Sequence, residues 1–257
     1  MGLIDSHAHL TYPELGLQID AVLARCADAG VDRIITIGTD LADGRRAIEL
    51  AMRHPTRIRA GVGFHPHHAE AVADGNYGAM AELWGHPLVV AAGEMGLDYH
   101  YDFADRAIQR SVFAKQLESA RGLSLPLIIH CSDAFEDAVL LLCDHGFRDR
   151  YVVFHCFTGT EAEVARAAEC GWRISFTGIV TFRDSTALQG LAKAYPETDL
   201  MIETDSPYLS PVPVRGRRPN EPANLVHTAR FLADLRGVPF ETLVEQTSRN
   251  TERFFGM

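Results

Sequence analysis

No two cysteines in this sequence have the spacing of a C-x-x-C motif, and their total of five is odd. A disulfide framework or a cysteine-ligated zinc site normally shows paired cysteines. The five are therefore interpreted as reduced thiols, as is usual for a cytosolic protein. They are Cys26, Cys131, Cys143, Cys156 and Cys170.

The sequence also has no apolar run near the roughly 20 residues that a membrane-spanning helix needs. Its N-terminus shows no basic region followed by a long apolar run, so we expect a cytoplasmic protein without a membrane partner. Acidic residues outnumber basic ones by 34 to 24, a formal net charge of −10. This charge disfavours a protein that coats nucleic acid, but it permits one bound strand end or a metal site built from carboxylates. No obligate protein partner is predicted.

Apolar, β-branched runs alternate with amphipathic helical stretches along the whole chain, without a linker or a low-complexity tract. The stretch at 106–123 has four apolar side chains on one face, Ile108, Phe113, Leu117 and Ala120. Such alternation predicts a parallel sheet with right-handed crossovers. Eight strands in 257 residues fit a (β/α)8 TIM barrel better than a doubly wound open sheet. We therefore predict the α/β class and a single TIM-barrel domain over residues 1–257. The predicted strands are GLIDSH, RIITIG, RIRAGVG, LVVAAGE, LPLIIH, YVVFH, WRISFTG and LMIET.

Histidine and acidic side chains follow these apolar runs at the points where the predicted strands end. In a TIM barrel the carboxyl ends of all strands meet at one mouth, where catalytic groups collect. His7 and His9 are two positions apart on one strand, so both imidazoles face the same side. Imidazoles and carboxylates without cysteine suit Zn²⁺, Mn²⁺ or Mg²⁺ at a hydrolytic site, and a carboxylate such as Glu94 can bridge two ions. The seven candidate residues are His7, His9, His65, Glu94, His130, His155 and Asp205.

Each of these residues also has an ordinary structural interpretation. A lone histidine is more often a surface or packing residue than a ligand, which applies most to His65 and its neighbours His67 and His68. Glu94 or Asp205 alone can cap the helix after its strand. The metal site is preferred because so many such groups fall at the same level of the barrel.

From DSHAHL near the start to SRNTERFF near the end, a series of segments follows the pattern of one family. In these segments the sequence resembles the TatD family of metal-dependent deoxyribonucleases, within the wider group of amidohydrolase-like barrels. The resemblance implies a TIM-barrel hydrolase of the ester bonds of DNA, typically a 3′–5′ exodeoxyribonuclease that acts on a strand end. It also implies one or two divalent ions, Zn, Mg or Mn, as cofactor. The matching segments run through the chain in the family's order: DSHAHL, GFHPHHA, GEMGLDYHYD, LPLIIHCSDA, FHCFTG, ETDSPYLSPVPVRGRRPNEP and SRNTERFF.

The same resemblance implies a role for each matching residue. His65 would lie near the substrate phosphate rather than on a metal. The residues implied for the first ion are His7, His9, Glu94 and Asp205. Those implied for the second ion are Glu94, His130 and His155.

One segment departs from the family's pattern. Family members usually carry a basic residue shortly after the fifth-strand histidine, as in H-x-R-D-A, where this sequence reads HCSDA with Ser132. A hydroxyl offers one weak contact where a guanidinium offers a charged fork, which leaves open how phosphate is held. Substrate-binding residues that would compensate are Arg215 and Arg217, with Arg218 beside them, although a solvated surface loop is an equal interpretation.

Two catalytic residues and two supporting ones complete the prediction. We expect Asp205 to orient a metal-activated water and accept its proton, and His65 to stabilise charge at the phosphate. Glu203, two positions before Asp205 and one layer deeper, is either a hydrogen-bond acceptor for the far nitrogen of a ligand histidine or an ordinary buried polar contact. Asp98 is interpreted as a loop or supporting residue rather than a ligand.

Two other functions fit parts of the pattern. The same barrel and H-x-H start serve metal-dependent hydrolases of C–N or C–O bonds in small molecules. Many of those bridge their metals with a modified lysine on the fourth strand, where this sequence has Glu94, which favours phosphodiester hydrolysis. A metal-binding scaffold without turnover is the second alternative, and Ser132 is the residue that keeps it open.

Overall fold

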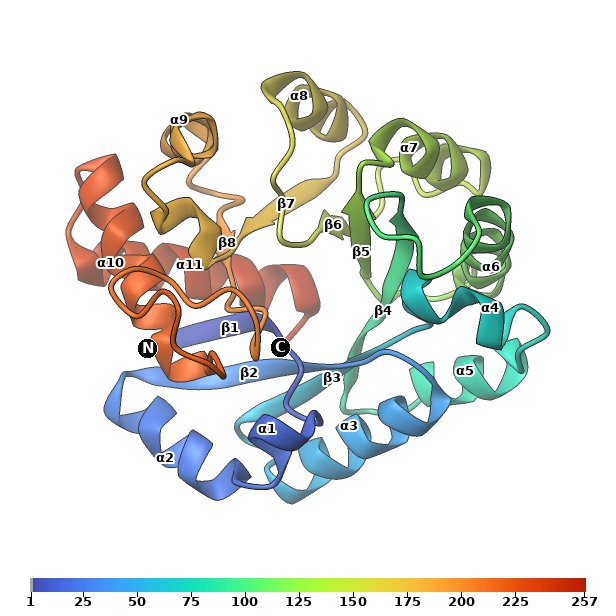
Figure 1. Cartoon of the computed structure of the whole chain (residues 1–257), viewed down its shortest axis with the longest axis horizontal. Helices are drawn as coiled ribbons and strands as arrows, with labels where there is room; N and C mark the ends of the chain where they lie inside the picture. The colour runs from blue at the N-terminus through green and yellow to red at the C-terminus, as the bar shows by residue number, and fades with distance from the viewer. Residues whose placement is uncertain (1) are drawn as a thin grey trace.

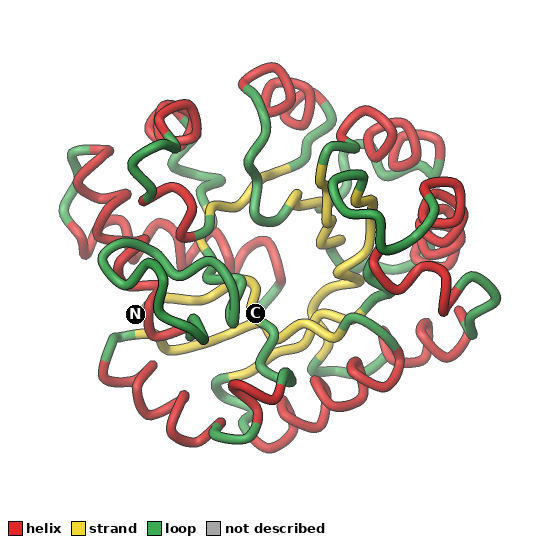
Figure 2. The backbone as a smooth tube through the Cα atoms, in the orientation of Figure 1, coloured by secondary structure: helices red, strands yellow, loops and turns green. Residues whose placement is uncertain are grey.

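Eight strands form one sheet whose spatial order, β1 to β8, follows the chain, and helices surround it (Figures 1 and 2). Each neighbouring pair is parallel. The computed structural model describes residues 2–257. It confirms the predicted (β/α)8 TIM barrel, and each predicted run overlaps a strand. The strands are β1 (Leu3–Ala8), β2 (Val31–Gly38), β3 (Ile58–Val62), β4 (Val89–Asp98), β5 (Leu127–Ser132), β6 (Val152–Phe154), β7 (Arg173–Phe176) and β8 (Met201–Ile202).

The segments between the strands are largely helical, and capping side chains explain where several helices begin. Asp40, Asp105 and Thr160 each accept a hydrogen bond from an N–H in the first turn. Three short 3-10 turns are η1 (Pro66–His68), η2 (Gly178–Thr181) and η3 (Pro222–Asn224). The α-helices are α1 (Pro13–Gly16), α2 (Ile19–Asp28), α3 (Leu41–Arg53), α4 (Ala69–Val72), α5 (Tyr77–Trp84), α6 (Arg106–Ala120), α7 (Phe135–Asp144), α8 (Glu161–Glu169), α9 (Thr186–Ala194), α10 (Leu225–Arg236) and α11 (Phe240–Phe255).

The barrel closes between β1 and the segment that follows β8. Ala8 and Ser206 form an isolated parallel bridge. The His9 N–H donates to the carbonyl of Ser206 at 2.7 Å, and the Asp205 N–H donates to the carbonyl of His7 at 2.9 Å. Backbone hydrogen bonds therefore hold three of the candidate residues side by side, although they lie near opposite ends of the sequence.

The inside of the barrel is a packed apolar core, sealed at one end by α11. Because side chains alternate along a strand, one set of apolar residues faces the helices and the other fills the barrel. The Ser248 hydroxyl donates to the carbonyl of Gly2 and the Asn250 amide to that of Leu200, so α11 lies across the amino-terminal ends of β1 and β8. The opposite end of the barrel is left for the site. The inner core comprises Ile35, Ile37, Val90, Ala91, Ile128, Val153, Met201, Phe254 and Phe255.

Helix α6 differs in one respect from the predicted amphipathic stretch. Ile108 is only partly buried, whereas Gln109 and Gln116 are fully buried on the inner face. The Gln109 side chain accepts from the N–H of Asp98 (2.7 Å) and donates to its carbonyl (2.8 Å). Gln116 makes the same pair with Phe64, at 2.8 and 3.0 Å. The two glutamines thus fix the backbone where β3 and β4 end.

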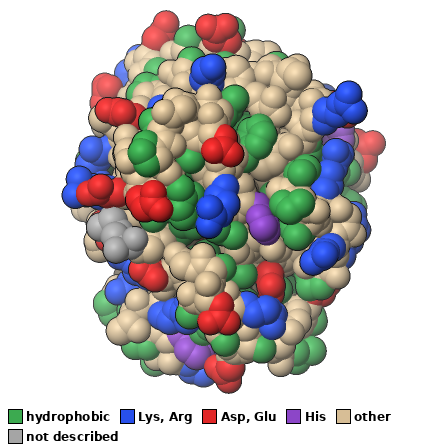
Figure 3. Space-filling view, turned by 90° about the vertical axis from the view of Figure 1, so that its left-hand side faces the viewer, with side chains coloured by type: hydrophobic (Ala, Val, Ile, Leu, Met, Phe, Trp, Pro, Cys, Tyr) green, Lys and Arg blue, Asp and Glu red, His purple; other side chains and the backbone are tan. Residues whose placement is uncertain are grey.

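Acidic and basic side chains are interspersed on the outer face of the molecule that Figure 3 shows. Such mixing gives no single-sign field over that face, although the chain as a whole has a net charge of −10. Within residues 2–257, no helix is both long enough and apolar enough to span a bilayer.

Candidate metal centre

Strand alternation brings the candidate side chains to the carboxyl-terminal mouth of the barrel. On β5 the inward-facing Ile128 is followed two residues later by His130, and on β6 Val153 is followed by His155. The mouth opens into a cavity of about 1000 Å³, lined by every candidate except the more deeply buried His7. The predicted residues are therefore brought together rather than scattered.

Glu94 lies at the centre of this cluster, with 1% of its side chain exposed. Its Oε1 is 2.6 Å from His155 Nε2 and 2.8 Å from His130 Nδ1. Its Oε2 faces the other side, 3.4 Å from His7 Nε2 and 3.8 Å from His9 Nε2. The two oxygens of one carboxylate thus face two separate pairs of imidazoles, which is the arrangement that a bridging ligand needs.

Asp205 completes the group around Glu94 Oε2. Its Oδ1 lies 3.4 Å from His9 Nε2 and 3.6 Å from His7 Nε2. The residue has a φ of 53°, a left-handed conformation that aspartate adopts more readily than most side chains. The rings of His7 and His155 stack with centroids 3.9 Å apart, so the two halves of the cluster are in contact.

Buried polar atoms of this cluster lack a hydrogen-bond partner among the described residues. They include Nε2 of His7 and Oε2 of Glu94. An unpaired buried group costs about 1–3 kcal/mol, so these atoms indicate that a further group pairs with them. A divalent cation fits, because imidazole nitrogens and carboxylate oxygens are its usual ligands. Two sets of residues have ligand atoms that all lie within 4.8 Å of one another. The set of His7, His9 and Glu94 matches the first implied set except for Asp205. The set of Glu94, His130 and His155 matches the second implied set in full.

The two carboxylates of the cluster carry the charge that metal ligation requires. Burial alone would raise the pKa of Glu94, but the surrounding histidines outweigh it and hold that pKa well below its usual value. Burial likewise opposes ionisation of Asp205, whose pKa is nevertheless lowered by His9 and His7. Both carboxylates are therefore ionised near neutral pH and able to bind a cation.

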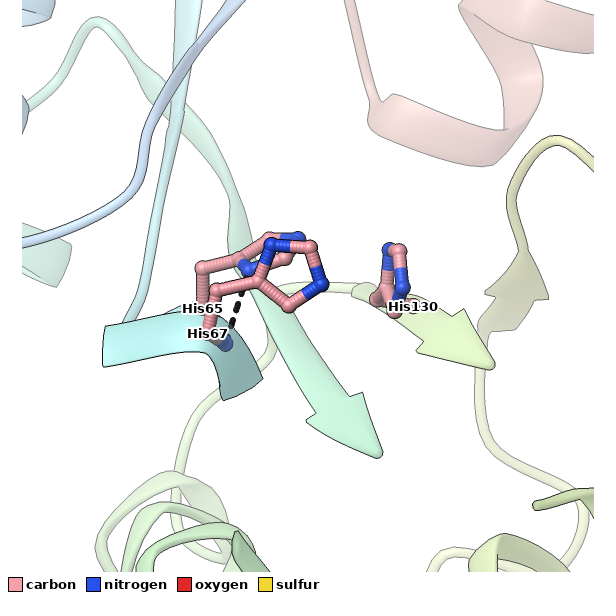
Figure 4. Close-up of side chains that lie close together, drawn as sticks. All are labelled: His65, His67 and His130. Carbon is pink, nitrogen blue, oxygen red and sulfur yellow. Dashed lines mark hydrogen bonds between the residues drawn. The ribbon is translucent and has the colours of Figure 1, made fainter. Parts of the chain in front are cut away.

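His65, His67 and His130 form a second group of rings beside Glu94 (Figure 4). The N–H of His67 donates to His65 Nδ1 at 3.1 Å, so the proton of a neutral His65 ring resides on Nε2. Burial lowers the pKa of His65 to about 3, which keeps the ring neutral. Its Nε2, 3.3 Å from Glu94 Oε1, is thus a hydrogen-bond donor rather than a metal-binding lone pair.

Asp98, buried at the end of β4, supports two of these rings at once. Its Oδ2 lies 2.9 Å from His130 Nε2 and 2.8 Å from His67 Nε2. Its Oδ1 accepts from the N–H groups of His100 and Tyr101, at 3.0 and 2.9 Å. Because His130 Nε2 donates to Asp98, its Nδ1 keeps the lone pair that faces the cluster. The position agrees with a supporting role.

Glu203 lies one layer below the cluster. Its Oε1 is 3.5 Å from His155 Nδ1 and accepts from the N–H of Cys156 at 2.6 Å. Its Oε2 accepts from the hydroxyl of Ser6 at 3.0 Å. Glu203 therefore faces the far nitrogen of His155 without a hydrogen bond to it, and the contacts with Cys156 and Ser6 were not expected from the sequence.

The predicted substrate-binding arginines and the divergent Ser132 line the same cavity. Ser132, Arg215 and Arg217 all contribute to its wall. The Arg215 guanidinium lies 3.9 Å from the centroid of the Phe182 ring, a cation–π contact that holds it at the cavity. None of Arg215, Arg217 and Arg218 forms an ion pair with a described residue, so their charges are available to a ligand.

Sequence reasoning missed the aromatic lining of the cavity. Tyr12, Tyr101, Phe103 and Tyr208 all line it. Their position in loops directly after strands was a usable signal, because such loops form the rim of a barrel. The hydrogen-bonding of Gln109 and Gln116 was missed as well, since polar residues on an amphipathic helix are normally assigned to its outer face.

Comparisons with known proteins agree with this geometry. Residues 4–256 match the family model described as TatD related DNase. The uncharacterized metal-dependent hydrolase YabD of Bacillus subtilis (strain 168) is 39% identical over 256 residues, 98% of each chain. The 3′-5′ ssDNA/RNA exonuclease TatD of Erwinia tasmaniensis is 34% identical over 259 residues, 99% of this chain and 100% of the other. The crystal structure of YJJV, a TatD homolog from Escherichia coli K12, superposes with a TM-score of 0.92 at 27% identity and covers 99% of this chain and 98% of the other.

Proposed function

The chain belongs to the family of TatD-related DNases and is a metal-dependent hydrolase of ester bonds, and we propose that it is a 3′–5′ exonuclease acting on DNA strand ends. The observation that carries this proposal is the two-sided cluster around Glu94. A carboxylate with one imidazole pair at each oxygen is suited to a pair of ions, which is the arrangement used for in-line displacement at phosphorus. The activity named for the Erwinia tasmaniensis relative supports the polarity and a single-stranded substrate.

The cofactor in this proposal is one or two divalent ions, Zn²⁺, Mg²⁺ or Mn²⁺. Bound there, such ions supply an activated water and neutralise charge that develops on the phosphate. The first would be held by His7, His9, Glu94 and Asp205. The second would be held by Glu94, His130 and His155.

The chain's own residues orient the substrate and move the proton. Asp205 accepts the proton of the attacking water at Oδ2, because its Oδ1 faces His7 and His9. His65 donates from Nε2 to a phosphate oxygen, where negative charge increases during the reaction. Arg215 holds the substrate phosphate, because Ser132 stands where family members usually carry a basic residue.

The supporting residues fix the orientation of the rings. Glu203 faces Nδ1 of His155 and leaves Nε2 of that ring toward Glu94. Asp98 faces Nε2 of His130 and leaves Nδ1 of that ring toward Glu94. Partners of this kind set which nitrogen carries the lone pair, so they contribute to metal affinity.

A substrate panel tests the proposal. The protein, first chelated and then reloaded with Mg²⁺, Mn²⁺ or Zn²⁺, is given 3′-labelled single strands, lactones and cyclic amides. We expect stepwise release of nucleotides from the 3′ end, lost on chelation and restored on reloading. Cleavage of the lactones or amides alone would identify a small-molecule hydrolase, and no turnover after reloading would identify an inert scaffold.

Two histidine variants provide the matched comparison. His7→Asn removes a ring from the cluster and should abolish the activity. His54→Asn removes a ring at the end of α3, which leads into the amino-terminal end of β3. This variant should leave the activity unchanged. Equal activity of the two variants would contradict a metal role for His7.

A further inference from the structure

The cavity above the metal cluster has two unlike walls. One is the loop between β4 and α6, which carries Tyr101 and Phe103 with 52% and 60% of their surface exposed. The other is the loop after β8, which carries Arg215, Arg217 and Arg218. The two loops lie on opposite sides of the barrel in Figure 1, the β4–α6 loop to the right and the loop after β8 to the left. One wall thus presents two exposed aromatic rings, and the other presents three arginines together with the exposed ring of Tyr208.

The aromatic ledge, meaning Tyr101 and Phe103, is joined to the cluster by direct contacts. Their ring centroids are 5.5 Å apart with planes inclined by 33°. The ring of His67 packs 4.6 Å from Phe103 and 5.8 Å from Tyr101. His67 and the N–H of Tyr101 both bind the Asp98 carboxylate, which also binds His130. The ring of His67 therefore connects the ledge to the rings of the cluster.

This exposure is not explained by the ordinary scatter of aromatic residues over a surface. A single exposed aromatic side chain is common, and Tyr151, 52% exposed at the amino-terminal end of β6, is an example. Tyr101 and Phe103 instead contact each other, line the same cavity as the cluster and are held by its supporting residues. Adjacent exposed apolar groups at a cavity indicate a ligand surface.

The division of the cavity matches the chemistry of a nucleotide. A nucleotide has a flat, apolar base on one side and an anionic phosphate on the other. Aromatic side chains bind bases of any sequence by stacking, provided that the base is unpaired. Guanidinium groups bind the phosphates that connect the nucleotides.

We propose that the aromatic ledge stacks an unpaired base of the substrate strand while the arginines of the loop after β8 hold neighbouring phosphates. This inference rests on the proposed nuclease function and adds the basis of its selectivity. A base inside a duplex has both faces covered by its neighbours, and at a blunt end only the terminal pair has one free face, so the strand must separate from its partner before its bases can stack on the ledge in turn. The ledge therefore selects unpaired strand ends over blunt duplex ends.

An abasic scan tests the ledge directly. The substrates are 3′-labelled single strands in which one tetrahydrofuran abasic nucleotide occupies each of the last four positions in turn. The proteins are wild type, Phe103→Ala, Tyr101→Ala and the conservative Phe103→Trp, with Tyr151→Ala as the control of equal exposure. Because the ledge residues are exposed, their thermal unfolding midpoints should stay at the wild-type value, which a melting curve verifies.

We expect the ledge variant and the abasic nucleotide to remove the same stacking contact, so their effects on KM should not add. Phe103→Ala should raise KM for an ordinary single strand about tenfold with little change in kcat, the size of one lost stacking contact. The wild type should show the same loss when the abasic nucleotide is at the stacked position, and Phe103→Ala should show no further loss there. Phe103→Trp and Tyr151→Ala should behave as wild type. The preference for a single strand over a blunt duplex should fall about tenfold in Phe103→Ala.

The outcomes separate this inference from the function on which it rests. The ledge alone is overturned if the wild type cleaves single strands but an abasic nucleotide raises KM in Phe103→Ala as much as in the wild type at every position. A wild type that cleaves no oligonucleotide with any of the three ions overturns the nuclease function and the ledge with it.

Discussion

Asp205 and Glu94 differ in their access to the cavity. Glu94 has 1% of its side chain exposed and both oxygens facing imidazoles, whereas 14% of the Asp205 side chain is exposed. Only Oδ1 of Asp205 faces the histidines. This difference suits Glu94 to holding ions and Asp205 to exchanging a proton with water.

Replacement of Asp205 by asparagine tests that assignment. Asp205→Asn keeps the shape of the side chain but cannot accept a proton, so kcat on a 3′-labelled single strand should fall by about 10²–10⁴. The thermal unfolding midpoint of the chelated protein should be nearly unchanged. Near wild-type turnover in this variant would show that Asp205 is not the base.

The buried carboxylate of Glu94 predicts how the metal-free protein responds to acid. The surrounding histidines hold its folded-state pKa well below the roughly 4.3 of an unfolded chain. A carboxylate with a depressed pKa contributes stability above its unfolded pKa and loses it as the pH falls toward the folded value. The unfolding free energy of the chelated protein should therefore decline below about pH 4.5, as measured by urea titrations. Glu94→Gln should decline less steeply, and an identical slope would contradict the assignment.

Among the elements, β4 has the tightest backbone constraints around the site. Gly93 and Gly96, on either side of Glu94, have φ values of +132° and +144°, which side chains other than glycine rarely adopt. A Cβ at Gly96 would collide with the carbonyl oxygen of His130 on β5. The glycines therefore allow β4 and β5 to approach closely enough for Glu94 to meet His130.

Helix α6 supports the end of β4, and one substitution tests how much. Gln109→Leu leaves the buried N–H and carbonyl of Asp98 without partners, so the unfolding free energy should fall by about 2–4 kcal/mol. Activity should fall too, because Asp98 holds two of the cluster's rings. Urea unfolding and kcat measure the two effects. Glu118→Leu, exposed on the same helix, is the control, and equal stability of the two variants would refute the role of Gln109.

For the molecule as a whole, the barrel fold and the proximity of the candidate residues could be predicted, because both follow from the alternation of strands and helices along the sequence. Strands that alternate with helices imply a barrel, and a barrel brings His7 and Asp205 to one mouth whatever their separation in sequence. The rim position of Tyr101 and Phe103 could be predicted in the same way, but their contact with each other could not, since the course of a loop depends on contacts such as that of Tyr101 with Asp98. Sequence alone also gave no distance by which to choose between the two interpretations of Glu203.

Metal binding should stabilise the entire barrel, because the cluster joins strands from both ends of the sheet. At an ion concentration about 100 times Kd, mass action contributes about 2.7 kcal/mol. For a chain of this size that raises the unfolding midpoint by roughly 5–10 °C, and a chelator should reverse the shift. Differential scanning calorimetry measures it. His7→Asn should lose the shift and His54→Asn should keep it, whereas no shift in the wild type would mean that the cluster binds no ion.

The meeting of β1 with the segment after β8 also has a consequence for protein synthesis. His7 and His9 leave the ribosome well before Asp205. A nascent or prematurely terminated chain carries the imidazoles without the carboxylate that completes them. Under the proposed function, a chain interrupted before Asp205 lacks the residue that accepts the proton of the water, so it should not cut DNA.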